Sequence, residues 1–135
     1  MTLTFLRLAV RVAAAVLSCS AATAQVAVVM SVNAGPLTKE QVANLYLGRS
    51  AELRPYDLPD GSATRDTFYR KAAQRDAAQM KAAWSRIVFS GKGVPPREVI
   101  DASEVKKAVA NDPKEIGYID KSDVASRVKV VLVLE

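Results

Sequence analysis

Two largely apolar runs, each interrupted by a single polar residue, constrain the fold of this chain more than any other feature. Residues 26–32 and 128–134 each have the length of one β-strand and are rich in valine. A half-solvated strand would alternate apolar and polar residues, and neither run does so. Both runs are therefore expected to be strands within a well-covered sheet, and the first is expected to be buried on both faces.

Amphipathic helix patterns separate these apolar runs. Thr38 and Gln41 form a capping box at the start of one helix, and Asp76 and Gln79 form another. The helices are expected over residues 38–47, 65–74, 76–88 and 101–110, and shorter strands over residues 53–58 and 116–119. This alternation predicts an α/β sandwich in which helices flank a mixed or mostly parallel sheet.

The helix expected over residues 76–88 carries Met80, Trp84 and Val88 at helical spacing. Such a stripe is typical of a core-facing surface, so Trp84 is expected in the core rather than as a stacking platform. The glycine-rich loop at residues 90–93 lacks the spacing of a phosphate-binding P-loop. It is expected only to end the helix and to turn the chain.

Residues 1–24 have the three-part layout of a secretory signal peptide. The first eleven residues carry two arginines, Arg7 and Arg11, and no acidic residue. The apolar stretch at residues 8–17 is too short for a stable transmembrane helix. A small-residue cleavage site ends at Ala24. Cleavage there would leave one domain at residues 25–135, in the periplasm or secreted. A lipoprotein anchored through Cys19 is the alternative, although the residues before it fit that processing site poorly.

The composition argues against most kinds of catalysis. Cys19 is the only cysteine, and the chain has no histidine. Residues 25–135 therefore lack the usual zinc ligands, the usual general base and a cysteine nucleophile. Asp57 and Asp60 form a conceivable metal pair, but no third carboxylate falls in register with them. We expect neither an enzyme nor a cofactor-dependent or metal-binding protein.

The charge pattern points to a small anionic ligand or an acidic partner surface. The formal net charge of +5 falls by two, to +3, once the segment with its two arginines is removed. The basic residues are scattered and are not interleaved with aromatic residues, so nucleic acid is not an expected partner. A modest positive field still suits an anion.

One turn before a helix supplies the candidate ligand-binding residues: Asp60, Gly61, Ser62, Ala63, Thr64 and Arg65. A helix N-terminus has unpaired N–H groups and a partial positive charge. Small residues let an oxyanion approach this backbone, and hydroxyl groups add donors. Serine and threonine are also ordinary N-cap residues, so a simple cap is the alternative explanation.

Several segments, taken in order, resemble the phosphate-binding proteins of ABC transporters, which have the periplasmic type 2 solute-binding fold. The matching segments are Leu37–Gly48, Asp60–Thr64, Trp84–Arg86, Phe89–Gly93 and Asn111–Ile119. They cover nearly the whole of residues 25–135 and look most like short relatives that have a single lobe. The resemblance implies a single-lobe α/β domain related to phosphate transport.

The resemblance also implies roles for the candidate loop. In the family's Asp-Gly-Ser-Gly-Thr loop, the aspartate accepts a hydrogen bond from a protonated phosphate oxygen while hydroxyl and N–H groups donate. Asp60, Ser62 and Thr64 occupy the matching positions. Leu58 stands where the family usually has a clamping arginine, and Ala63 replaces the middle glycine. Arg65 could supply the missing charge from the other side of the loop.

A single lobe would offer only half of the binding site found in the two-lobed family. We expect weak affinity for phosphate or a similar oxyanion, with a homodimer or a membrane transporter or sensor supplying the second wall. The alternative function is a ligand-free periplasmic interaction module that docks on a sensor or transporter.

Overall fold

The computed structural model describes residues 25–135, so the predicted signal peptide, its cleavage site and Cys19 lie outside the described residues. The elements along the chain are β1 (Val26–Ser31), α1 (Lys39–Tyr46), β2 (Arg54–Asp57), α2 (Ala63–Ala73), α3 (Ala77–Phe89), β3 (Arg97–Glu98), α4 (Ala102–Asn111), β4 (Glu115–Asp120), the 3₁₀ turn η1 (Lys121–Asp123) and β5 (Val128–Leu134). The predicted helices and strands are present within a few residues of their expected bounds. Strand β3 was not predicted, because two residues are too few to show a periodic pattern.

The strands form one mixed sheet with the order β3-β2-β4-β1-β5. Strand β2 pairs in parallel with β3 and with β4, whereas β1 is antiparallel to both β4 and β5. Strand β1 therefore runs against the other strands of the sheet, which all share one direction. The predicted mixed, mostly parallel sheet of an α/β fold is confirmed.

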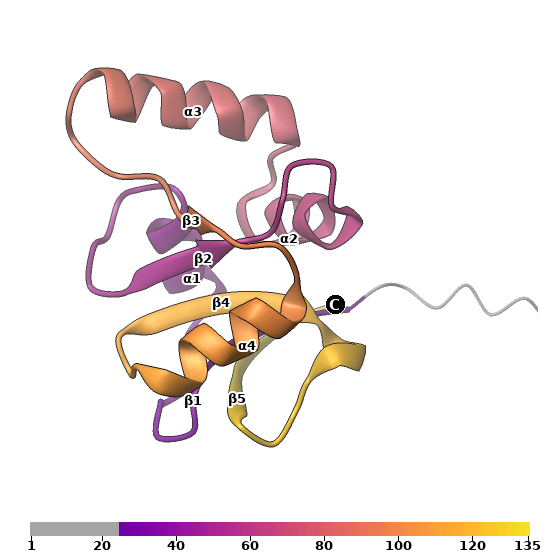
Figure 1. The fold of residues 1–135 in the computed structure, drawn as a ribbon. Helices are drawn as coiled ribbons and strands as arrows, with labels where there is room; N and C mark the ends of the chain where they lie inside the picture. Colours follow the sequence, from indigo (N-terminus) through magenta and orange to yellow (C-terminus); the bar gives the residue numbers. More distant parts are fainter. Residues whose placement is uncertain (1–24) are drawn as a thin grey trace, which may run out of the picture.

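Helices cover both faces of this sheet (Figure 1). Consecutive residues of β4 show this, because neighbouring side chains of a strand point to opposite faces. Gly117 lies against Val105 of α4, while Tyr118 stacks on Phe68 of α2. Every residue of β1 is buried between these layers, as the sequence predicted.

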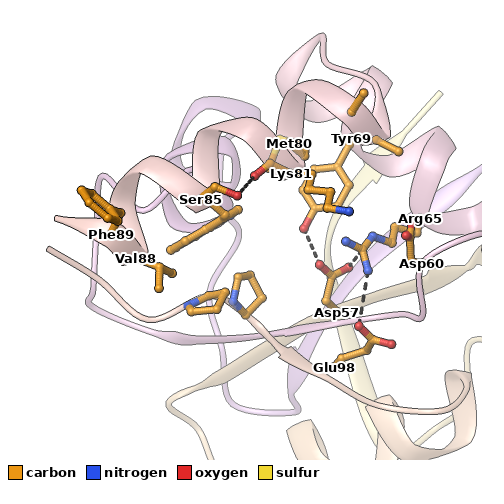
Figure 2. A pocket seen from close by; sticks show the side chains of 15 residues that line it. Asp57, Asp60, Arg65, Tyr69, Met80, Lys81, Ser85, Val88, Phe89 and Glu98 are labelled. Carbon is orange, nitrogen blue, oxygen red and sulfur yellow. Dashed lines mark hydrogen bonds and ion pairs between the residues drawn. The ribbon is translucent and has the colours of Figure 1, made fainter. Parts of the chain in front are cut away.

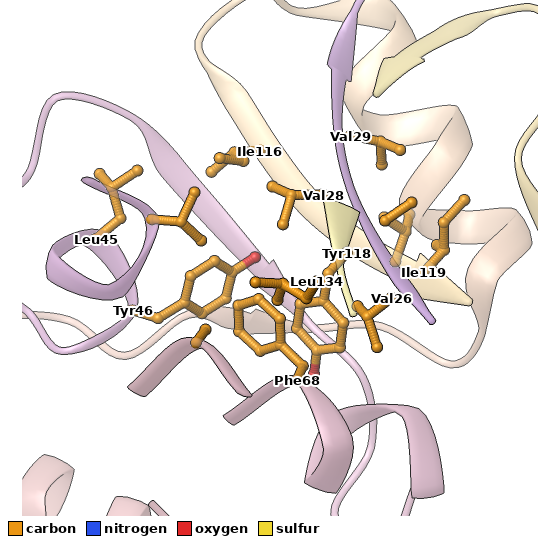
Figure 3. Close-up of a cluster of buried hydrophobic side chains, with 14 of the residues drawn as sticks. Val26, Val28, Val29, Leu45, Tyr46, Phe68, Ile116, Tyr118, Ile119 and Leu134 are labelled. Atoms are coloured by element: carbon orange, nitrogen blue, oxygen red, sulfur yellow. The ribbon is translucent and has the colours of Figure 1, made fainter. Parts of the chain in front are cut away.

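Aromatic side chains fill the core between the sheet and helices α1 and α2 (Figure 3). The rings of Phe68 and Tyr118 stack with centroids 3.9 Å apart, and Tyr46 meets Phe68 edge to face at 4.7 Å. Aromatic pairs of this geometry add stability beyond the apolar area that they bury. This packing fixes the position of Tyr118, whose hydroxyl group reaches the site described below.

Helix α3 lies away from the sheet, and this overturns part of its predicted packing (Figure 1). Met80 is buried and Trp84 is partly buried, with the Trp84 indole N–H donating to the Tyr46 carbonyl at 3.0 Å. The prediction was wrong for Val88, which is 51% exposed, and the neighbouring Phe89 is 95% exposed. The apolar stripe exists, but no layer of the fold covers its C-terminal half.

Strand β5 also differs from the expectation of a fully covered strand. It lies at an edge of the sheet, and only some of its side chains are buried. Within residues 25–135, no helix has both the length and the apolar character that crossing a bilayer would need.

Candidate functional site

A buried carboxylate lies where strand β2 ends. The Asp57 side chain accepts hydrogen bonds from the Tyr69 hydroxyl at 2.6 Å, from the Tyr118 hydroxyl and from the Leu58 N–H at 3.0 Å. Asp57 is only 5% exposed, and burial raises its pKa, while these donors and Arg65 act in the opposite direction. Burial and the nearby carboxylate also raise the pKa of both tyrosines, which keeps them protonated as donors.

The Arg65 side chain folds back across the turn toward this carboxylate. Its Nε lies 3.8 Å from Asp57 Oδ1, and its Nη1 donates to the Leu58 carbonyl at 2.8 Å. The same Nη1 lies 3.7 Å from Glu98 Oε2, and the guanidinium stands 5.7 Å from the centre of the Tyr69 ring. Position 58 has a leucine and no charge of its own. The Arg65 guanidinium instead lies against the Leu58 carbonyl, between Asp57 of β2 and Glu98 of β3.

The predicted loop forms the N-terminus of α2. Ser62 is the N-cap, and its Oγ accepts from the Arg65 N–H at 3.3 Å. Gly61 precedes it with φ +88°, a conformation that glycine adopts without steric cost. In the described residues, the N–H groups of Ala63 and Thr64 have no acceptor. A capping serine still has its O–H to donate, so this geometry is compatible with both a cap and an anion site.

A cavity of about 830 Å³ opens between α3 and the end of β2 (Figure 2). Charged side chains form one end of it: Asp57, Asp60, Arg65, Lys81 and Glu98. Figure 2 shows Arg65 reaching between Asp57 and Glu98 at this end. The side chains come from β2, the following turn, α2, α3 and β3, so the fold assembles them from distant parts of the sequence.

The structure places the predicted site residues in two groups. Asp60 and Arg65 line the cavity, whereas the intervening residues 61–64 form the turn and the first residues of α2 beside it. Sequence reasoning missed Glu98 and considered Asp57 only as a possible metal ligand. Asp57 has a recognisable signal, a carboxylate within a predicted short strand, but nothing local to Glu98 indicates its contact with Arg65. Within the described residues, no cluster of three metal-ligating side chains occurs.

Comparison with known proteins gives structural matches but no sequence-level match. No family model and no curated protein matches the chain. A putative phosphate ABC transporter substrate-binding protein from Clostridium perfringens, solved with bound phosphate, is similar over 80% of this chain, with a TM-score of 0.63 and 22% identity. An ABC-type phosphate transport receptor from Vibrio cholerae is similar over 80% of the chain, with a TM-score of 0.61 and 18% identity.

A third solved structure, a possible phosphate binding protein from Planctomyces limnophilus, matches 80% of the chain with a TM-score of 0.56 and 14% identity. The matches cover 45%, 46% and 41% of these three proteins, so the chain spans less than half of their length. Identities this low establish the fold alone. The resemblance proposed from the sequence is confirmed at that level: this chain has an α/β fold that matches part of the phosphate ABC transporter substrate-binding proteins.

Proposed function

We propose that this protein is exported to the periplasm, where its single domain binds phosphate or a similar small oxyanion at Asp60–Arg65. On this proposal it is a non-enzymatic binding protein related to the substrate-binding subunits of ABC transporters, and it needs no cofactor. The fold match supports the relation, since one matching structure contains bound phosphate.

The observation that carries the proposal is a set of donors around the turn at the charged end of the cavity. The N–H groups of Ala63 and Thr64 at the start of α2 have no acceptor among the described residues, and the Arg65 guanidinium lies against the Leu58 carbonyl on the other side of this turn. The helix terminus adds a partial positive charge to these donors. An anion there would accept from the two amides and from the Ser62 hydroxyl, while Asp60 would accept from a protonated phosphate oxygen.

The carboxylates around Arg65 tune this site toward weak binding. Asp57 and Glu98 both lie within 4 Å of the guanidinium, so an incoming anion shares that charge with them. The cavity is also open to solvent, and water weakens charge interactions. A second wall, contributed by another copy of the chain or by a membrane transporter or sensor, would exclude water and tighten binding.

Calorimetric titration of the full chain with phosphate, at low and at moderate salt and with sulfate as a comparison, tests the proposal. We expect saturable heat in the micromolar to low millimolar range. Ser62→Ala removes one donor to a charged ligand, which is worth about 1.5–3 kcal/mol, so its affinity should fall about tenfold or more. Arg65→Gln should also lower the affinity for phosphate.

Matched variants separate a lost ligand contact from a lost helix cap. Thr38→Ala removes the N-cap of α1, which does not line the cavity, and should lower stability without changing phosphate affinity. Arg70→Gln, on the exposed side of α2, is the control for Arg65→Gln. No heat from a folded protein, or equal loss in the test and control variants, would contradict the proposal and favour an interaction module that docks on a sensor or transporter.

A further inference from the structure

We propose that the ligand of this site is an organic phosphate monoester rather than inorganic phosphate. Its phosphoryl group would lie at the Arg65 end of the cavity, and its organic group along the wall formed by α3. This inference rests on the proposed function, because it uses the same anion-binding end. It adds the chemical class of the ligand, which follows from the other half of the cavity.

The wall opposite the charged end is apolar. It is formed by Met80, Trp84 and Val88 from α3 and by Pro95–Pro96 from the loop before β3. Figure 2 shows Val88 on the side of the cavity away from Arg65. These α3 positions are the stripe that the sequence predicts as core, and in the fold they also border the cavity, with Val88 left exposed. Apolar surface of this kind is stabilised when a ligand or partner removes it from water.

The size of the cavity fits an organic molecule better than a tetrahedral anion. Its volume of about 830 Å³ lies within the range of about 300–1,000 Å³ that is usual for small-molecule sites. Such sites are mostly apolar, with a few polar groups that orient the ligand. Inorganic phosphate bound at Arg65 would leave the α3 wall in contact with water, whereas the organic group of a monoester would cover it.

The polar end combines two cations with three carboxylates, Asp57, Asp60 and Glu98, so it favours an anion that can also donate a hydrogen bond. Arg65 and Lys81 supply positive charge there, and Figure 2 shows Lys81 extending toward the Arg65 end. Asp60 and Glu98 at the same end disfavour a ligand that only accepts hydrogen bonds. A phosphate monoester can keep one proton and donate it to a carboxylate, whereas a sulfate ester is fully ionised and has no proton to donate.

Trp84 provides the readout for the test. It is the only tryptophan of the chain and it lines the cavity, so its fluorescence reports on the occupancy of the wall. The full chain is titrated with inorganic phosphate, methyl phosphate, hexyl phosphate, hexyl sulfate and hexanol. Each buried methylene contributes about fourfold in affinity, from about 0.8 kcal/mol. We therefore expect hexyl phosphate to bind at least tenfold more tightly than methyl phosphate, and hexyl sulfate and hexanol to bind weakly.

Two valine variants check the location of the organic group. Val88→Ser changes the wall, and Val94→Ser changes an 85% exposed valine that does not line the cavity. Val88→Ser should lower the affinity for hexyl phosphate several-fold and leave the affinity for inorganic phosphate unchanged. Val94→Ser should change neither affinity. Circular dichroism of both variants verifies that they are folded.

The outcomes distinguish this inference from the function on which it rests. If inorganic phosphate binds in a Ser62-dependent way and hexyl phosphate binds no more tightly than methyl phosphate, the inference is overturned and the proposed function stands. Equal affinity for hexyl phosphate and hexanol would also overturn it, because the cavity would then bind alkyl chains without using its charged end. If no phosphate compound binds, the proposed function itself fails.

Discussion

Asp57 shows how the fold holds a charged residue in place without exposing it. Its two carboxylate oxygens accept from Tyr69, Tyr118 and the backbone of Leu58, and Arg65 lies beside it. A buried carboxylate without such partners would be strongly destabilising. The arrangement in turn orients Arg65, so Asp57 is a positioning residue for the proposed anion site rather than a ligand contact.

The replacement Asp57→Asn tests this arrangement. The amide offers one acceptor where the carboxylate offers two, so one tyrosine hydroxyl loses its partner and the free energy of unfolding should fall by about 1–3 kcal/mol at neutral pH. Burial raises the folded-state pKa of Asp57 above its unfolded value of about 3.9. The folded wild type therefore binds this proton more tightly than the unfolded chain does, and the proton stabilises it increasingly as pH falls through the raised pKa.

The measurement is urea denaturation of both proteins at pH values from neutral to about 4, near the unfolded pKa. The stability difference between the wild type and Asp57→Asn should widen as pH falls over this window. The other carboxylates are common to both proteins and largely cancel in the difference. Parallel stability curves would contradict a raised pKa for Asp57.

At the scale of elements, α4 and α3 represent opposite kinds of packing. Helix α4 lies so close to β4 that a Cβ built on Gly117 would clash with Val105 Cγ1. Helix α3 is held mainly by Met80 and by the Trp84 hydrogen bond to α1, and the rest of its apolar stripe borders a cavity. The close contact fixes the fold, and the loose one leaves space for a ligand.

Gly117→Ala is expected to destabilise the protein through the contact between α4 and β4. Overpacking of this kind costs about 1–3 kcal/mol in the free energy of unfolding. Gly35→Ala is the control, because a Cβ there meets no atom within 4 Å. The double variant Gly117→Ala with Val105→Ala should lose less free energy of unfolding than the sum of the losses in the two single variants. Equal costs for Gly117→Ala and Gly35→Ala in chemical denaturation would contradict this picture.

At the scale of the whole molecule, the described residues form one α/β layer structure with an open cavity along one side (Figures 1 and 2). The chain spans less than half of the length of the phosphate-binding proteins that it resembles. On the proposed function, this domain corresponds to one lobe of a two-lobed protein and contacts the anion from one side only. Affinity then depends on whatever covers the opposite side.

Phosphate binding should appear as a change in global stability. A ligand at a hundredfold excess over its dissociation constant stabilises the folded state by about 2.7 kcal/mol. The thermal midpoint of unfolding should therefore rise with phosphate concentration, and by less with sulfate at equal ionic strength. Equal shifts with both salts would contradict a preference of the site for phosphate over sulfate.

Features that depend on a few neighbouring residues could be predicted from the sequence. The capping boxes at Thr38 and Asp76 are present, and β1 is buried on both faces as its largely apolar run predicted. The order of strands and helices was enough to predict the α/β class with a mixed sheet. The Asp60–Arg65 turn lies at a helix N-terminus as predicted, since Ser62 caps α2 through a contact only three residues long.

The sequence by itself therefore determined the elements, the fold class and the place of the candidate loop, because these follow from local capping and periodicity. Only the tertiary structure decided that Arg65 meets Asp57 and Glu98, and that the C-terminal half of the α3 stripe is exposed beside a cavity. The physical reason is that hydrophobic periodicity shows that a surface is apolar but does not show what covers it. Contacts between side chains distant in the sequence depend on how the layers pack.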